Sequence, residues 1–287
     1  MHRAVYHAAA ATGILAGAQK ALIIAPMKYF LVGLLLLLAA PGASLAKYRM
    51  RVIRHIVLDP GHGGTNPGAP SVTGVFEKYL TLPLALEVER QLREASDATV
   101  TLTRRTDTTI GLRERARLAN EAGGDVFISI HCNASENPEA SGLEVYFLDP
   151  EAAESEFAGV VDREERGAEP AVAPRPAGPP AAEHAPLTVD QVVLDATMFK
   201  SHEVSETLAG TLLDTIHDVV SVPRRGVHQA AFGVLKEAEM PAVVLEVGYL
   251  SHAEEGKKLA EPKYQEKLAR GIVKALLALD KRLAKGD

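Results

Sequence analysis

The chain has 287 residues, 47% of them apolar, and a formal net charge of −6, which allows one large domain or two small ones. The acidic balance argues against nucleic acid as a partner. Because Cys132 is the single cysteine, an intrachain disulfide framework is excluded.

The first 46 residues differ from the rest because they contain no Asp or Glu. Lys28 precedes an apolar run at 30–40, and Ser44 and Ala46 place small residues at the −3 and −1 positions of a cleavage site after Ala46. A membrane-spanning helix needs about 20 apolar residues. Residues 1–46 are therefore predicted to be an N-terminal extension and signal peptide, with a retained N-terminal anchor as the alternative, and the protein to be periplasmic or secreted.

Apolar periodicity divides the remaining chain into alternating strands and helices. Strands are predicted at 56–58, 99–103, 126–130, 143–148, 232–236 and 242–247. Helices are predicted from 77 to about 92, at 112–122, from 189 to about 220 with a break near 201, and at 264–283. The fold class is therefore α/β: a single domain, about 51–284, with a mixed, mostly parallel central sheet of about six strands flanked by helices.

Residues 151–190 interrupt this alternation. They contain six prolines, nine acidic and three basic residues, and no sustained apolar period. The part at 170–186 is expected to be disordered. A loop of this length inside a compact domain is usually either functional or disordered, so both a linker and a regulatory insert stay open here.

Four side chains stand where α/β proteins place their chemistry. His62 lies in a Gly/Pro turn after the first predicted strand, and His131 closes the third. Glu77 opens a helix, and Glu246 lies in an apolar strand, where a buried carboxylate must be paired, metal-bound or protonated. Taken singly, each residue could have a purely structural role: a packed histidine, a glutamate that stabilises a helix start, or a hydrogen-bonded glutamate in the core. Together, two histidines and one glutamate would leave a fourth position open on zinc, and the second glutamate can serve as a base.

Eight short segments carry a family resemblance. In chain order they are Leu58-Asp-Pro-Gly-His-Gly-Gly64, Glu77-Lys78, Thr103-Arg104 with Asp107, Leu112-x-x-Arg115 with Ala119-Asn120, Phe127-Ile-Ser-Ile-His-Cys-Asn-Ala134, Gly142-Leu-Glu-Val-Tyr146, Val234-Leu235 and Pro241-Ala-Val-Val-Leu-Glu246. In order and spacing the chain resembles the zinc-dependent N-acetylmuramoyl-L-alanine amidases of bacterial cell walls. The resemblance covers residues 56 to about 279, apart from the insert.

The resemblance implies a role for each of the four residues. His62, Glu77 and His131 would bind Zn²⁺, and Glu246 would be the general base for a zinc-activated water. The implied reaction cleaves the amide between the lactyl group of N-acetylmuramic acid and L-alanine of the stem peptide, in cell-wall remodelling or daughter-cell separation. Peptidoglycan is the implied substrate and partner, and the protein is expected to be a monomer.

The insert also resembles one branch of the family. In the division-associated branch, an insertion after the fourth strand carries a helix that covers the zinc and silences the enzyme, and for this protein we would then expect an activator protein that displaces the insert. Residues 151–190 lie at this point, and the sequence at 162–166 resembles part of that insertion. A carboxylate of Glu164 or Glu165 would then occupy the open zinc position. A solvated acidic linker is the equal alternative, because charge runs are usually solvated.

The other prominent residues receive structural interpretations. Arg104, Arg115 and Asn120 are expected to form ion pairs and turn hydrogen bonds, and His228 and His252 are expected at the surface.

Two positions depart from the family pattern. Cys132 stands where alanine is commoner, and it is expected to pack on the sheet face opposite to His131. The sequence Tyr-Leu-Ser-His at 249–252 replaces the usual Phe-Ile-Ser-Asn. Neither departure touches the four key positions.

Two rival functions fit the same residues. Another zinc hydrolase of similar fold, such as a carboxypeptidase, would need an arginine to bind a terminal carboxylate, and no motif specifies one. A degenerate amidase that only binds the wall or regulates a partner would be expected to lack a ligand or the base, whereas all four residues are present.

Overall fold

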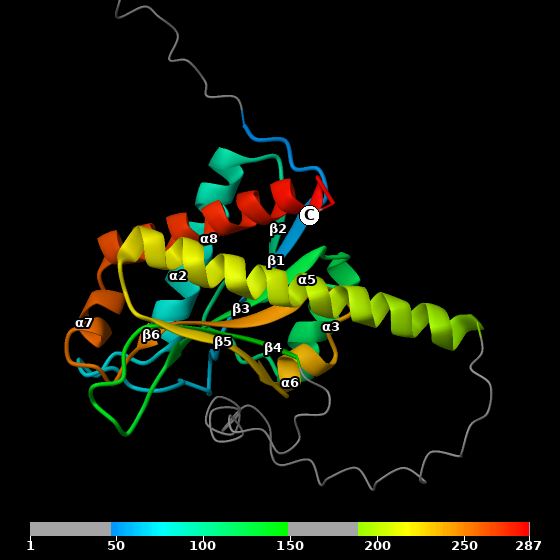
Figure 1. Cartoon of the computed structure of the whole chain (residues 1–287). Coiled ribbons are helices and arrows are strands. Elements are labelled where there is room, and N and C mark those ends of the chain that lie inside the picture. The colour runs from blue at the N-terminus through cyan, green and yellow to red at the C-terminus, as the bar shows by residue number, and fades with distance from the viewer. Residues whose placement is uncertain (1–46, 149–188, 287) are drawn as a thin grey trace, which may run out of the picture. The chain divides into compact units, whose positions relative to one another are not determined.

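A six-stranded sheet organises the part of the chain that the computed structural model describes, residues 47–148 and 189–286 (Figure 1). Its strands are β1 (His55–Pro60), β2 (Thr99–Leu102), β3 (Val126–Asn133), β4 (Leu143–Leu148), β5 (Arg224–Ala230) and β6 (Ala242–Tyr249). Their order is β2-β1-β3-β6-β4-β5, and all neighbours run parallel except β4 and β6, which are antiparallel. The predicted mixed, mostly parallel sheet is confirmed.

Helices cover both faces of the sheet. They are α2 (Lys78–Ala95), α3 (Leu112–Ala122), α5 (Val189–Val220), α6 (Gly233–Lys236), α7 (Glu255–Leu259) and α8 (Pro262–Leu283). In Figure 1 the long helices α5 and α8 run side by side across one face, where they are in contact, and the start of α5 extends beyond α8. The shorter α3 and α6 contact each other and pack on the opposite face.

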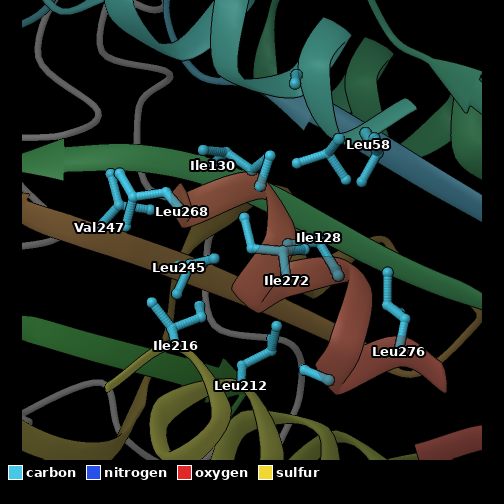
Figure 2. Packing of buried hydrophobic residues seen from close by; sticks show 14 of the residues in the cluster. Leu58, Ile128, Ile130, Leu212, Ile216, Leu245, Val247, Leu268, Ile272 and Leu276 are labelled. Carbon is cyan, nitrogen blue, oxygen red and sulfur yellow. The ribbon is translucent and has the colours of Figure 1, made fainter. Parts of the chain in front are cut away.

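The core follows from the alternation of side chains along each strand. One set, including Leu58, Ile128 and Leu245, is fully buried against α2, α5 and α8. Figure 2 shows this set meeting residues of α5 and α8, namely Leu212, Ile216, Leu268, Ile272 and Leu276. The alternate set, including Phe127 and Val244, packs on α3 and α6. Burying each such side chain contributes about 1.5–3 kcal/mol to the stability of the sheet that carries the strand ends.

Two of the sequence predictions for secondary structure are wrong. The segment 232–236, predicted as a strand, contains the short helix α6 instead. Its buried Val234 and Leu235 gave a short apolar run, which periodicity alone cannot assign. The fifth strand is β5, whose sequence Arg-Arg-Gly-Val-His-Gln-Ala is mostly polar because it lies at the sheet edge. In addition, α5 passes Ser201 without the predicted break.

Two predicted segments lie outside the described residues. They are the N-terminal extension and signal peptide at 1–46, and the insert up to residue 188, with Glu164 and Glu165. Within the described ranges, none of the helices combines the length and apolar character that crossing a membrane requires.

Candidate active site

The turn after β1 presents His62 at the carboxyl edge of the sheet. His62 is almost fully buried and has a positive φ of 55°, which is uncommon for a non-glycine residue and typical of functional sites. Its Nδ1 lies 3.1 Å from Asn66 Oδ1. Because that oxygen also accepts the Gly68 N–H, it is an acceptor, and His62 Nδ1 must be the donor. This contact directs the Nε2 atom of His62 into the site.

Glu77 faces His62 from the residue directly before α2. Its side chain is fully buried, and His62 Nε2 lies 2.9 Å from its Oε2. The backbone N–H groups of Cys132 and Ala69 donate to its two oxygens at 2.9 and 3.2 Å. Burial alone would raise the pKa of the Glu77 carboxyl, but His62 and His131 outweigh it and hold the pKa well below its usual range. Glu77 is therefore an ionised carboxylate.

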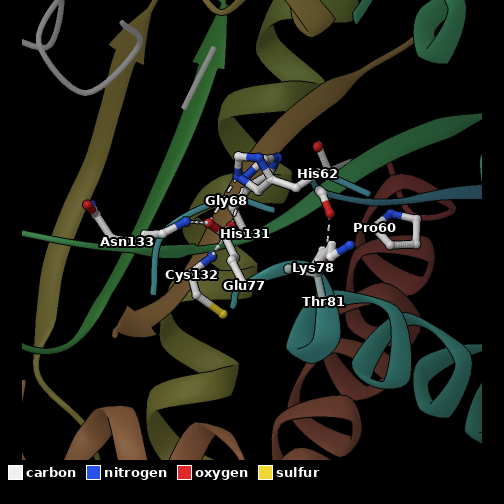
Figure 3. Close-up of polar contacts among 12 residues, drawn as sticks. Pro60, His62, Gly68, Glu77, Lys78, Thr81, His131, Cys132 and Asn133 are labelled. Atoms are coloured by element: carbon white, nitrogen blue, oxygen red, sulfur yellow. Dashed lines mark hydrogen bonds and ion pairs between the residues drawn. The ribbon is translucent and has the colours of Figure 1, made fainter. Parts of the chain in front are cut away.

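His131, near the end of β3, completes a cluster of three. Its Nδ1 lies 3.1 Å from Glu77 Oε1, and its ring stands edge-on to that of His62 with centroids 4.9 Å apart. One ligand atom from each of the three residues lies within 4.8 Å of the others. Figure 3 shows the side chains of His62, Glu77 and His131 converging from a turn, a helix start and a strand end. This group could hold a metal ion.

The backbone at Gly68 lies directly against this cluster. A Cβ built on Gly68 would lie 2.6 Å from Glu77 Oε2 and 2.7 Å from His62 Cδ2, and the residue has a φ of +71°. Only glycine satisfies both the conformation and the close approach. The loop that precedes α2 therefore forms one wall of the cluster.

Glu246 lies on the strand next to His131. It is fully buried in β6, and its Cα is in register with His131 of β3 on one side and Glu144 of β4 on the other. Residues in register project from the same face of a sheet. Because β1, β3 and β6 are adjacent and parallel, their carboxyl ends bring His62, His131 and Glu246 to one edge of the sheet. The structure thus places all four predicted residues together.

A second buried carboxylate, Glu144, was not singled out from the sequence. Its oxygens accept hydrogen bonds at 2.6–2.8 Å from four side chains: Asn133 Nδ2, Tyr146 OH, Tyr249 OH and Arg225 Nε. Burial would raise the pKa of Glu144, but the bonds from Arg225 and the two tyrosines hold it below its usual range. The signal was present, because Glu144, like Glu246, is an isolated charge in an apolar strand.

Two buried arginines hold the turn that carries His62. Arg115 donates to Asp59 Oδ1 and to the carbonyl of His62, both at 2.7 Å. Arg104 donates to the carbonyls of Pro60 and Gly61 at 2.9 and 2.7 Å. The predicted structural roles of both arginines are confirmed.

The remaining expectations concern residues around the site. Asn120 makes the predicted turn hydrogen bonds, to the backbone of Glu237 and Glu239. Cys132 is buried in the core on the opposite face from His131, as predicted.

The two histidines expected at the surface are instead half-buried. The His228 ring lies against Tyr146 with centroids 5.3 Å apart. His252 Nδ1 accepts the N–H groups of Glu254 and Glu255 at the start of α7.

Comparison with known proteins agrees with this geometry. Residues 56–278 match the sequence model of a family described as N-acetylmuramoyl-L-alanine amidase. The N-acetylmuramoyl-L-alanine amidase AmiA of Escherichia coli K12 is 34% identical over 226 residues, which is 78% of this chain and 75% of AmiA. AmiC of Neisseria meningitidis serogroup B is 33% identical over 217 residues, which is 76% of this chain and 50% of AmiC.

Solved structures give the same result. A crystal structure of an N-acetylmuramoyl-L-alanine amidase from Clostridium difficile 630 matches with a TM-score of 0.60 and 30% identity, and the match covers 83% of this chain and all of that one. The family predicted from the sequence motifs is confirmed by these matches. The chain belongs to the N-acetylmuramoyl-L-alanine amidase family.

Proposed function

We propose that this protein is a zinc-dependent peptidoglycan amidase that hydrolyses the bond between the lactyl group of N-acetylmuramic acid and L-alanine of the stem peptide. One observation carries the proposal: His62, Glu77 and His131 converge on one point, beside a buried Glu246 on the adjacent strand. Family membership supports the choice of amide bond, since the matching relatives are named as amidases that cut it.

The donor set fits a zinc ion. With Nδ1 of His62 acting as a donor, Nε2 is the ring atom that faces Glu77 Oε2, 2.9 Å away, and on losing its proton it could bind a metal ion together with that carboxylate. The two imidazoles approach different oxygens of Glu77, at 2.9 and 3.1 Å, and one ligand atom from each of the three residues lies within 4.8 Å of the others, which is compact enough for a single zinc ion. Three protein ligands would leave one position for water or substrate.

When bound, zinc would supply a water of lowered pKa and polarise the carbonyl that is attacked. Glu246 would accept the proton of the attacking water at a carboxylate oxygen. It would then pass this proton to the leaving amine nitrogen, which is otherwise a poor leaving group. Asn66, Cys132 and Ala69 would hold His62 and Glu77 in place through the contacts described above.

We also propose where the enzyme acts and how it is restrained, from the sequence alone. The signal peptide at 1–46 would export the domain to the periplasm or medium, where peptidoglycan is found. The acidic insert would bring Glu164 or Glu165 to the open zinc position until an activator protein removes it. Hydrolysis of this amide in the wall would serve cell-wall remodelling or daughter-cell separation.

Digestion of purified sacculi tests the proposal. The wild-type protein and a variant lacking residues 151–186 are incubated with sacculi, with a chelator, and with zinc added back. The expected products are stem peptides that begin with L-alanine and glycan strands with intact lactyl groups, found by mass spectrometry and abolished by the chelator. Release of terminal D-alanine would instead show a carboxypeptidase. If the zinc-loaded wild type and the zinc-loaded deletion variant both bind sacculi but release no product, the protein would be a non-catalytic wall-binding protein.

A further inference from the structure

One residue of β5, Arg225, lies in an irregularity of the sheet beside the site. In the pairing of β4 with β5, Leu143 is in register with Arg224 and Glu144 with Gly226, so Arg225 is an extra residue in a β-bulge. Gly226, with a φ of +141°, permits the distortion. Bulges are frequent next to active sites, where they redirect a side chain. This bulge turns Arg225 toward Glu144, on the face of the sheet that carries Glu246.

The guanidinium of Arg225 is fixed at one end and open at the other. Its Nε donates to the buried Glu144 at 2.6 Å, and its Cζ lies 5.1 Å from the centre of the Tyr249 ring. The Arg225 side chain is 41% exposed, whereas that of Glu144 is 6% exposed. Arginine has five N–H donors, so a bond through Nε leaves its two terminal NH₂ groups to bind a second carboxylate bidentately.

The distance from the reacting bond limits what this carboxylate can be. Neighbouring strands are about 4.8 Å apart, so β5 lies about 10 Å from Glu246, across β4. An extended peptide advances about 3.3 Å per residue. A peptide that enters with its first amide at Glu246 and crosses β4 would therefore place its second or third residue at Arg225. Stem peptides carry free carboxylates on the residues that follow the first alanine.

We propose that Arg225 binds a carboxylate of the stem peptide on the leaving side of the cleaved amide, and that Glu144 and Tyr249 position it. This inference rests on the proposed amidase function and adds the substrate preference: stem peptides with a free carboxylate are favoured over those in which it is amidated. Such selectivity is strongest with a charged donor pair in a fixed place, which the planar guanidinium of Arg provides and the single ammonium of Lys provides only in part.

Paired substrates test the assignment. N-acetylmuramoyl tripeptides with either a carboxylate or a carboxamide on the second residue are compared for kcat and KM. The wild-type enzyme is expected to favour the acid by about 10- to 100-fold, mostly through KM, because charge-assisted bonds to Arg225 are made equally in the ground and transition states. Arg225→Ala should cleave both forms alike, at the rate of the wild type on the amide. Arg225→Lys should recover part of the preference.

The adjacent arginine gives a matched control. Arg224 has a similarly exposed side chain but pairs with Asp214 at 2.6 Å, away from Glu144. Arg224→Ala should keep the full preference, and thermal melts should show that both alanine variants fold. An unchanged acid preference in Arg225→Ala, or an equal loss on both substrates, overturns the assignment. Calorimetric titration of the wild type with the free tripeptide acid and amide measures the binding preference due to Arg225 even if neither substrate is cleaved. Absence of cleavage would refute the proposed amidase function, separately from the role of Arg225.

Discussion

Glu246 is the residue on which the proposed chemistry depends most. It is fully buried and in register with His131, so its carboxylate lies beside the candidate metal ligands. Replacing it with glutamine keeps size and hydrogen-bonding ability but removes the proton acceptor. We expect Glu246→Gln to lower turnover of sacculi by about 10² to 10⁴. Zinc content and melting temperature should stay those of the wild type, as measured by elemental analysis and calorimetry. A rate within threefold of wild type would assign the base to another group.

Arg115 is expected to matter for stability rather than for catalysis. It forms a buried pair with Asp59, and both side chains are less than 5% exposed. Arg115→Ala would leave the Asp59 charge buried without its partner, at a cost of about 3–5 kcal/mol in the free energy of unfolding. Arg117, an exposed arginine on the same helix that pairs with Glu114 and Glu121, is the control. Its alanine variant should lose about 1 kcal/mol or less in urea unfolding. Equal losses in the two variants would contradict this assignment.

The same pair predicts how stability depends on pH. Burial would raise the pKa of Asp59, but the charge of Arg115 and the hydrogen bonds from Thr103, Ser129 and Arg115 hold it below its usual value. A depressed carboxyl pKa stabilises the fold above its unfolded value of about 3.9, and this stabilisation is lost as the pH falls through the folded pKa. The wild type should therefore lose more stability than Asp59→Asn between pH 5 and pH 3, in urea titrations of the metal-free proteins. Parallel curves would show that Asp59 contributes nothing to the acid sensitivity.

Among the elements, the loop between β1 and α2 has a glycine that can be tested directly. Gly68→Ala would push a methyl group into Glu77 Oε2 and His62 Cδ2. We expect zinc affinity to fall at least tenfold, because the ligands must move apart. Gly74 is the control, since it lies in the same loop with a φ of +80° but nothing within 4 Å of its Cβ position. Gly74→Ala should lower stability by about 1–2 kcal/mol through backbone strain while keeping zinc affinity. Competition titration with a zinc-binding dye measures the zinc affinity of the two variants. Equal affinities would show that the close approach of Gly68 to Glu77 and His62 does not matter for zinc binding.

The elements also show where sequence reasoning succeeds. Strands that are buried on both faces, such as β3 and β6, are continuous apolar runs, so they and the polar residues at their ends could be predicted. The edge strand β5 could not, because its stability comes from pairing with β4 and not from its own apolar content. The role of Arg225 depends on a bulge in that pairing. It is therefore a property of two strands about 80 residues apart in sequence and invisible in either alone.

At the scale of the whole molecule, the proposed restraint of activity depends on the insert. Residues 149–188 connect the end of β4 with the start of α5, and the chain of 40 residues is long enough to reach any part of the domain. If the insert restrains the enzyme, deleting residues 151–186 should raise sacculus hydrolysis. A closed state favoured 99:1 would give a gain of about a hundredfold. Replacing Glu164 and Glu165 with alanine should have the same effect, whereas replacing Glu151 and Glu154 should not.

The outcome to compare is the initial rate of dye release from labelled sacculi at equal zinc loading. A folded, zinc-loaded deletion variant that is no faster than wild type would show that the segment is a tether or a docking arm, and not an inhibitor.

The position of β6 also affects when the molecule can fold. Among the described strands it is the last along the chain, yet it stands between β3 and β4 and is the one that joins the β2-β1-β3 half of the sheet to the β4-β5 half. Until residues 242–249 are available, neither half can close on the other, and the long-range pairing that follows is slow. A chain exported from its N-terminus, as we propose, would therefore stay unfolded through most of its passage. Because β6 also brings Glu246 between His131 and Glu144, the candidate site would first exist only after this last strand has inserted, so the hydrolase would mature away from the cytoplasm that made it.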